Sequence, residues 1–198
     1  LSLTARQTRL GLKLKRGLTR GRIEMDFYGA GAENKNAVQL RYAYVDIPLG
    51  PVELSAGQAA DLILPLTPAT LNYGVLYGIG NLGFRRPQLN AHYRSGPYHF
   101  SLGLGRNLSD DLDGDGITDG DASGLPALQC RLGMHSATTD DKNGITMGVS
   151  GHYGRCSCPD NDTHYANWSL GFDALLELGP RLGLAGEAFW GENLRQFG

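Results

Sequence analysis

The 198-residue chain has no long hydrophobic run and few charged side chains. Its apolar stretches, such as 62–64 and 174–176, are far shorter than the roughly 18 residues that a membrane-spanning helix requires. Charged residues make up 19% of the chain, and a net charge of -2 provides no basic surface of the kind that binds nucleic acid. Residues 1–6 lack the apolar core of a signal peptide, so any export signal is expected to have been removed. We therefore expect neither a transmembrane helix nor a nucleic acid partner.

Glycine, by contrast, is abundant. The 29 glycines are roughly double the usual share, and glycine at that level opposes long helices. About ten runs instead alternate between apolar and polar residues, which is the period of a β-strand. In one of them, Val38, Leu40, Tyr42 and Tyr44 alternate with Gln39, Arg41 and Ala43. The pattern predicts an all-β, antiparallel protein of about ten strands with no convincing helix.

The connections between these runs are short and long in turn. Short links contain glycine or proline, as at 49–51, 95–97 and 179–181. Longer links are expected at 30–36, 65–84, 108–125 and 156–164. Strands of about ten residues, joined by tight turns at one end and long external loops at the other, are typical of outer-membrane barrels. The alternation therefore predicts a transmembrane β-barrel with the long links as its external loops.

The two faces of the runs favour the same fold. One face is apolar, while the other carries charged and amide side chains rather than the aliphatic ones that fill a small soluble barrel. In hydrocarbon every backbone polar group must be paired, and a closed barrel achieves this with an apolar outer surface and a wet lumen. The alternative is a soluble antiparallel sandwich with its apolar face inside. Such domains rarely show so many strands of equal length with alternating loop lengths.

We expect residues 1–198 to form one β-barrel domain that is part of a larger barrel. If the short turns are periplasmic, the first run enters from outside and the last run finishes outside. A complete bacterial barrel has an even number of strands and both termini in the periplasm. At least one further strand is therefore expected at each end, giving roughly twelve or more.

Several short segments carry a family resemblance, namely RIEMDF at 22–27, QLRYAYV at 39–45, AGQ at 56–58, TLNYG at 70–74, RRPQ at 85–88 and GEAFWGEN at 186–193. Together they resemble the DcaP-like outer-membrane porins. The resemblance implies a homotrimer in the outer membrane of a Gram-negative bacterium, in contact with outer-membrane lipid. It also implies passive diffusion of small hydrophilic solutes, with small anionic solutes favoured by the relatives. By this resemblance, the periplasmic N-terminal segment and the closing strands of such porins are expected to lie outside residues 1–198.

The polar residues of the alternating runs share one face and provide the candidate pore-lining residues. These are Arg9, Lys13, Arg22, Glu24, Asp26, Arg41, Arg94 and Arg131. Arginines facing acids across a lumen create a transverse field, and a cationic ladder lowers the barrier for carboxylates or phosphate. The same charges could instead only hydrate the lumen and pair with neighbours, and the close balance of sign leaves both interpretations open. The connection 65–84 could fold inward and narrow the pore, with Arg85 and Arg86 at its foot.

The link 108–125 contains the sharpest local motif, DLDGDGITD at 111–119. Carboxylates at alternate positions with a glycine for the bend have the spacing of a calcium loop. The predicted ligands are the carboxylates of Asp111, Asp113, Asp115 and Asp119 and the Ile117 carbonyl. Ala122 stands where an EF-hand has its bidentate glutamate, so a modest affinity is expected. The alternative is a hydrated acidic loop without metal. We favour a structural Ca²⁺ that stiffens the loop, because aspartates this dense repel one another.

The remaining candidate groups predict no catalysis. Cys130 lies in the apolar phase of its run, Cys156 and Cys158 are expected in an external loop, and their pairing stays open. His99 and Ser101 share a face, but no acid completes a nucleophilic site, so no enzyme is predicted. The sequence thus predicts an outer-membrane porin with no cofactor beyond structural calcium. The alternative is a soluble or cell-surface, calcium-stabilised β-rich binding or adhesion module.

Overall fold

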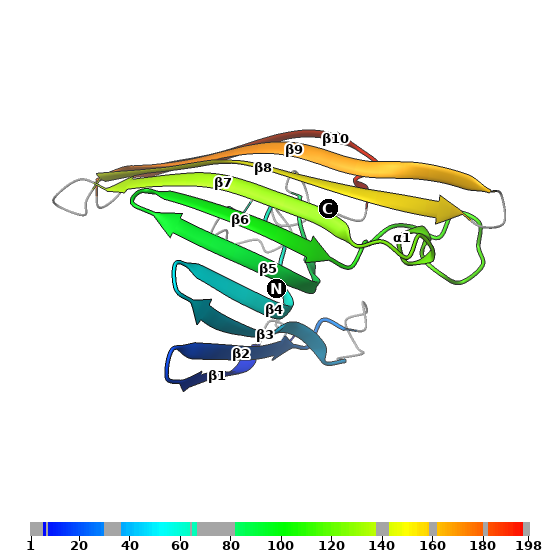
Figure 1. Ribbon diagram of the computed structural model, residues 1–198, viewed down its shortest axis with the longest axis horizontal. Helices are drawn as coiled ribbons and strands as arrows, with labels where there is room; N and C mark the ends of the chain where they lie inside the picture. The colour runs from blue at the N-terminus through cyan, green and yellow to red at the C-terminus, as the bar shows by residue number, and fades with distance from the viewer. Residues whose placement is uncertain are drawn as a thin grey trace, which may run out of the picture.

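The computed structural model contains one antiparallel sheet of ten strands in chain order (Figure 1). The structure describes residues 6, 8–29, 37–63, 65–66, 82–137, 143–158, 162–179 and 182–195. The strands are β1 (Leu10–Arg16), β2 (Thr19–Asp26), β3 (Gln39–Leu49), β4 (Val52–Ala60), β5 (Arg85–Ser95), β6 (Tyr98–Gly105), β7 (Ala127–Ala137), β8 (Asn143–Cys158), β9 (Thr163–Leu178) and β10 (Gly183–Glu192). The prediction of an all-β fold with about ten antiparallel strands is confirmed.

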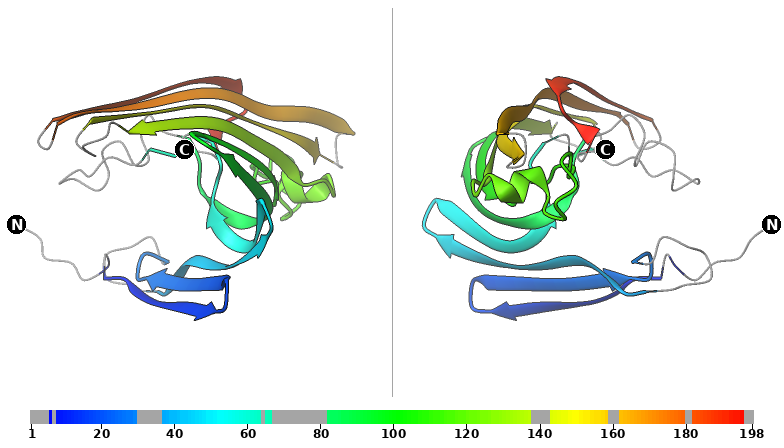
Figure 2. Two further views of the ribbon diagram at one scale, coloured as in Figure 1. Left: turned by 60° about the vertical axis from the view of Figure 1, so that its left-hand side comes forward. Right: turned by 90° about the vertical axis from the view of Figure 1, so that its right-hand side faces the viewer.

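The sheet is strongly curved. In Figure 2, β1 to β4 form the lower wall of a trough, the green strands β5 to β7 rise along its side, and β8 to β10 arch over the top. Each strand is hydrogen-bonded to the next one in the sequence. The sheet therefore has a concave face on the inside of the curve and a convex face on the outside.

Tight turns join β1 to β2, β3 to β4 and β5 to β6 at one end of the sheet. Gly17, Gly50 and Gly96 in these turns have φ angles of 60°, 64° and 56°. Glycine enters this region of backbone conformation without a steric penalty. The links at the other end, from β4 to β5 and from β6 to β7, are much longer. The expected loop at 30–36 and most of the one at 65–84 lie outside the described residues.

Two expectations about local structure are corrected. β8 and β9 have 16 residues each, so the long loop expected at 156–164 is wrong, and Cys156 and Cys158 belong to β8. The period of two continues to the end of that strand, where both cysteines are buried and Arg155 is exposed. The loop between β6 and β7 also contains a one-turn helix, α1 (Asp119–Ala122), which the sequence did not predict. No helix in the described part of the chain is long and apolar enough to cross a membrane.

Burial is inverted relative to a water-soluble protein. Among the described residues, nineteen polar or charged residues are buried, against five hydrophobic ones. The apolar core is a small cluster of Ile63 and Leu82 with Leu194 packed against it. Large hydrophobic side chains are instead exposed on the convex face, as Leu104 at 46% and Leu132 at 56%. Polar side chains therefore pack together inside the curve, and apolar side chains point away from it.

A β-bulge in β3 changes the face of two tyrosines. The register between β2 and β3 shifts after Glu24, which leaves Arg41 as the extra residue. A bulge of this kind reverses the alternation beyond it. The expectation that Tyr42 and Tyr44 lie in the apolar phase is therefore wrong, because they pair with Glu24 and Arg22 and share their concave face.

Candidate functional site

Two neighbouring rows of cross-strand partners describe the two faces of the sheet. The concave row holds only polar residues and glycine: Lys15, Arg20, Asp46, Ser55, Asn90, Gly103, Gln129, His152, Ser169 and Gly191. The convex row beside it is largely apolar: Leu14, Gly21, Val45, Ala56, Leu89, Leu104, Leu128, Tyr153, Trp168 and Glu192. Successive residues of a strand point to opposite faces, which is why the rows differ so sharply. The concave face is therefore the candidate functional surface.

Glycines on the concave face give long polar side chains room to lie along the sheet. A Cβ atom added to Gly148 would lie 2.3 Å from Arg131 Nη2. One added to Gly103 would lie 2.3 Å from Asn90 Oδ1. Both distances are well inside van der Waals contact, so a larger residue at either position would displace its polar neighbour.

An ion-pair network crosses β2 and β3 on this face. Arg22 Nη2 lies 2.5 Å from Glu24 Oε2, and Arg41 Nε donates to Glu24 Oε1 at 2.9 Å. Arg41 Nη1 donates to Asp26 Oδ2 at 2.7 Å, and both of these side chains are almost fully buried. Arg22 also lies over the ring of Tyr42, 4.3 Å from its centroid. Four of the predicted pore-lining residues thus form one network in which carboxylates offset the arginine charges.

Two further ion pairs are buried among β5 to β9. Arg131 contacts Asp173 through both terminal nitrogens, with Nη2 2.8 Å from Oδ2. Arg86 Nη2 donates to Asp61 Oδ2 at 2.8 Å. Asp173 and Arg86 are 0% exposed. A charge buried this deeply is tolerated when a partner of opposite sign accompanies it, and removal of that partner is strongly destabilising.

The chain that leaves β4 turns onto the concave face. Gln129 on β7 donates through Nε2 to Asp61 Oδ1 at 2.7 Å, and its Oε1 accepts from the Leu62 N–H at 2.7 Å. The Leu66 N–H then donates to Glu187 Oε1 on β10 at 2.8 Å. These contacts carry residues 61–63 and 65–66, which we call the crossing segment, over the concave face from β4 past β7 to β10.

The chain that returns to β5 is fixed at the same anchor. The Asp61 N–H donates to the Phe84 carbonyl at 2.8 Å, and the Phe84 N–H donates to Asp61 Oδ2 at 2.8 Å. Ile63 and Leu82, on the two sides of the connection, pack together. Arg86 therefore lies at the foot of this connection, and its part in a constriction stays a prediction. Arg85 lies on the opposite face of β5, with its guanidinium 5.3 Å from the Phe84 ring.

The remaining predicted pore-lining residues are exposed. Arg9 and Lys13 lie on the β1 side of the sheet, and Arg94 pairs with His99 near a tight turn. A hollow of about 390 Å³ on β1 to β3 is lined by Lys13 and by these further residues: Leu14, Lys15, Arg20, Gly21, Arg22, Tyr44 and Asp46. Four of its eight lining residues are cationic, and one is acidic.

The structure divides the five predicted calcium ligands. Carboxylate oxygens of Asp111, Asp113 and Asp115 lie within 4.8 Å of one another, an oxygen-rich arrangement that suits a hard cation. Asp111 also accepts hydrogen bonds from the N–H groups of glycines 114 and 116, at 2.7 and 3.0 Å. Asp119 belongs to a second group with Asp113 and Cys158. The Ile117 side chain is exposed, and its N–H donates to Asp115 Oδ1 at 2.7 Å.

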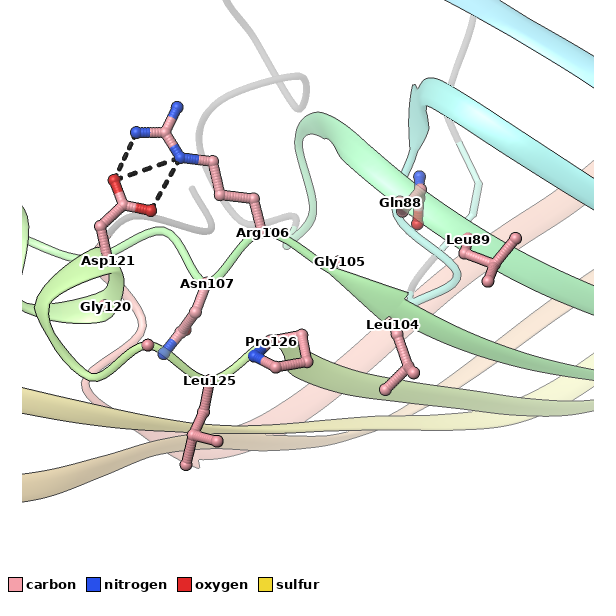
Figure 3. Close-up of a pocket in the computed structure, with 11 residues that line it drawn as sticks. Gln88, Leu89, Leu104, Gly105, Arg106, Asn107, Gly120, Asp121, Leu125 and Pro126 are labelled. Atoms are coloured by element: carbon pink, nitrogen blue, oxygen red, sulfur yellow. Dashed lines mark hydrogen bonds and ion pairs between the residues drawn. The ribbon is translucent and has the colours of Figure 1, made fainter.

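Arg106 closes the base of this loop. Its Nε donates to Asp121 Oδ1 at 2.9 Å, and further bonds join the same two groups (Figure 3). The hydrogen bonds from Arg106 lower the pKa of the Asp121 carboxyl, against a smaller opposing effect of desolvation. A hollow of about 440 Å³ lies beside the pair, and in Figure 3 Leu104 and Leu125, which also line it, point away from Arg106.

No model of a known protein family matches the chain, and no curated protein matches it. A solved structure does. The crystal structure of the outer membrane channel DcaP of Acinetobacter baumannii aligns with a TM-score of 0.78 over 98% of this chain and 54% of that chain, at 20% identity. This chain shares the fold of an outer-membrane channel. It spans about half the length of the DcaP chain. At this identity the likeness establishes the fold, and membership of the DcaP-like porins stays a prediction.

Sequence reasoning missed two residues that organise the channel-like face. Gln129 lies in the polar phase of its strand, so the alternation alone could have placed it on the concave face. Asp61 follows the end of β4 and belongs to no local motif. It contacts Gln129 across 68 positions of sequence, and no short-range pattern signals a contact of that kind.

Proposed function

We propose that this chain forms part of the wall of a water-filled pore in the outer membrane of a Gram-negative bacterium, through which small hydrophilic solutes diffuse passively. The observation that carries the proposal is the pair of cross-strand rows. The concave row has no apolar side chain on any of its ten strands, while the convex row beside it is largely apolar. A barrel in lipid needs this arrangement, because its outside faces hydrocarbon and its inside faces water.

The dimensions of the convex face support a membrane location. On β8 its residues run from Ile145 to Tyr153, which is roughly 27 Å at 3.4 Å per residue. A strand tilt of about 40° reduces this to about 21 Å, close to the 25 Å apolar band of outer-membrane barrels. Trp168 and Trp190 stack edge to face at 5.4 Å near the long-loop end of this band. Tyr98, which is 56% exposed, lies at the tight-turn end. Aromatic side chains at both ends suit the two lipid–water interfaces.

The crossing segment narrows the proposed pore. Its anchor combines a buried ion pair with hydrogen bonds from Gln129 and Phe84, all made by the single carboxylate of Asp61. Its far end reaches Glu187 on β10. A segment held at both sides of the concave face reduces the cross-section that is open to solutes.

The charges of the concave face favour at most a weak preference for anions. Arg22, Arg41, Arg86 and Arg131 each contact a carboxylate, so their charge is largely offset. The hollow on β1 to β3, where lysine and arginine outnumber acids, offers a cationic surface to carboxylates or phosphate. We expect small hydrophilic solutes of both signs to pass, with anions favoured there.

We also propose that the protein forms an oligomer and that its function involves no catalysed reaction. We expect a homotrimer surrounded by outer-membrane lipid, which follows from the resemblance to DcaP-like porins. Passive diffusion requires no catalytic residue and no cofactor. Crosslinking of the full-length protein in native membranes, read as the size of the largest discrete species, tests the trimer.

The experiment that tests the pore is current measurement with the full-length protein in a planar bilayer across a KCl gradient. We expect discrete conductance steps and a reversal potential slightly on the anion-selective side. Gln129→Leu combined with Glu187→Ala removes the side-chain contacts of the crossing segment with β7 and β10 and keeps the buried pair of Asp61 and Arg86, so a larger step is expected. Cys130→Ser, on the convex face, is the matched control and leaves the step unchanged. Protein that inserts into the bilayer without passing current contradicts the proposal.

The alternative of a soluble, calcium-stabilised binding module makes an opposite prediction. A barrel stays in the membrane fraction until detergent is added and then migrates anomalously on gels unless boiled. A soluble module is released by buffer alone. The exposed apolar side chains of the convex face, such as Leu132 and Leu170, favour the barrel.

A further inference from the structure

Among the residues that the structure describes, one buried carboxylate lacks the neutralising arginine that the others have. Four aspartates are buried among the described residues: Asp26, Asp61, Asp119 and Asp173. Three of them form salt bridges: Asp26 with Arg41, Asp61 with Arg86 and Asp173 with Arg131. Asp119 is 0% exposed, and no salt bridge joins it to any described residue.

Within the described part of the chain, the hydrogen-bond donors to the Asp119 carboxylate are all neutral. Its Oδ2 accepts from the Tyr165 hydroxyl at 2.7 Å and from the Cys158 thiol at 3.1 Å. Its Oδ1 accepts from the Leu112 N–H at 3.3 Å. An ionised carboxylate in such a place is costly unless a cation accompanies it. The arrangement therefore lacks one positive charge.

Ligands for a cation converge at this point. Oxygens of Asp113 and Asp119 and the sulfur of Cys158 lie within 4.8 Å of one another. They come from three parts of the chain, namely the loop after β6, the first residue of α1 and the last residue of β8. Asp119 and Cys158 are both buried, so the group is set into the fold rather than displayed on its surface.

We propose that Asp113, Asp119 and Cys158 bind a divalent transition metal ion, with Zn²⁺ as the species that fits best. A thiolate is a poor ligand for Ca²⁺, which prefers oxygen, whereas Zn²⁺ accepts sulfur and carboxylate together. On binding, the Cys158 thiol releases its proton to solvent and a metal–sulfur bond replaces the hydrogen bond to Asp119. Water fills the fourth position.

The surroundings suit this site. Tyr165 keeps its hydrogen bond to Asp119 and so orients the carboxylate, the usual task of a residue behind a metal ligand. Around Zn²⁺ the ligand atoms must close to about 3.5 Å, as bond lengths of 2.0 to 2.3 Å require. Asp113 lies in an irregular loop and can make that adjustment. The ion would then tie α1 to the long-loop end of β8.

This site is distinct from the predicted calcium loop, although the two share Asp113. Asp111 and Asp115 complete the oxygen-only group and are exposed. Cys158 and Asp119 complete the buried group. Saturation with Zn²⁺ is therefore expected to weaken calcium binding in the loop, because one carboxylate cannot serve both ions fully. The proposal does not rest on the pore function.

The test is a Co²⁺ titration of the full-length protein after removal of metals with EDTA. Cobalt bound to a thiolate in a four-coordinate site absorbs in the near ultraviolet and visible, whereas hydrated cobalt is almost colourless. We expect both bands to saturate at one Co²⁺ per chain, to disappear on adding one equivalent of Zn²⁺ and to persist in excess Ca²⁺. Cys158→Ser removes the near-ultraviolet band, and the matched control Cys130→Ser retains it.

A second measurement uses the unmodified sequence and so does not depend on the folding of a variant. Iodoacetamide labelling is followed by peptide mass spectrometry with and without Zn²⁺. We expect Zn²⁺ to slow the labelling of Cys158 at least tenfold and to leave the exposed Cys130 unchanged. Equal labelling rates of Cys158 in both conditions overturn the proposal. A near-ultraviolet cobalt band that survives in Cys158→Ser overturns it as well.

Discussion

Replacing Arg131 by methionine removes one partner of a buried ion pair and leaves the other, Asp173, buried on the concave face of the sheet. The two side chains are 7% and 0% exposed. Methionine keeps the length and most of the volume of the arginine stem, so the change is mainly one of charge. Loss of one partner of a buried pair costs about 3 to 5 kcal/mol. Asp173 has no second cationic partner within salt-bridge distance among the described residues, so we expect a value in that range.

Two further variants separate charge from packing. Arg131→Met combined with Asp173→Leu removes both charges, and such replacements of a whole buried pair are often neutral or stabilising. The double variant is therefore expected to be more stable than Arg131→Met alone. Arg20→Met is the matched control, because Arg20 is 54% exposed and its partner Glu53 is 29% exposed. An exposed pair of this kind contributes about 0 to 1 kcal/mol.

The assay is equilibrium urea unfolding of the protein refolded into lipid vesicles, followed by the fluorescence of Trp168 and Trp190. A loss of less than about 1 kcal/mol in Arg131→Met would refute the reasoning, because that is the magnitude of a water-exposed pair. The concave layer of β5 to β9 would then be hydrated rather than packed. Equal losses in the single and double variants would refute it too, since the cost would come from volume and not from charge.

Three other outcomes follow from the structure. Lys13→Gln with Lys15→Gln removes two cations from the hollow on β1 to β3, so the reversal potential in a KCl gradient should move toward cation selectivity. Asp111→Asn removes a charged oxygen ligand from the predicted calcium loop, and calorimetric titration should give a Ca²⁺ affinity lower by about tenfold. Arg106 lowers the pKa of Asp121 below its ordinary value of 3.8, so the pair's stabilisation is complete above that value and is lost as pH falls through the lowered pKa. Proteolysis of this loop should therefore accelerate only below about pH 4, and Arg106→Gln should abolish that pH dependence.

The strands and their faces could be predicted from sequence because they depend on a local period of two. Arg131 and Asp173 both fall in the polar phase of their runs, and the structure places them on one face. Where the backbone departs from that period, the prediction fails. The extra residue Arg41 reverses the phase of Tyr42, and nothing in the alternation of apolar and polar residues announces a bulge.

The alternation of apolar and polar residues also cannot predict contacts between distant parts of the chain, because it is a local pattern. The Cys158 thiol meets Asp119 across 39 positions of sequence, and its burial depends on the loop that folds over the end of β8. The sequence suggested calcium ligands from spacing within nine residues. Spacing alone could not reveal that the Asp119 carboxylate accepts hydrogen bonds from Cys158 on β8 and Tyr165 on β9.

The distribution of exposed and buried charge indicates where solutes would travel if the chain lines a pore. On β5 to β9 the concave face is filled by buried side chains such as Arg86 and Gln129, and the crossing segment lies over it. On β1 to β3 the same face keeps exposed or half-exposed cations, including Lys13 and Arg20, around a hollow. Because packed side chains fill the concave face of β5 to β9, we expect solutes to pass along the concave face of β1 to β3. Substitutions at Lys13 should therefore change ion selectivity without affecting stability, while substitutions at Gln129 should affect the size of the pore and the stability together.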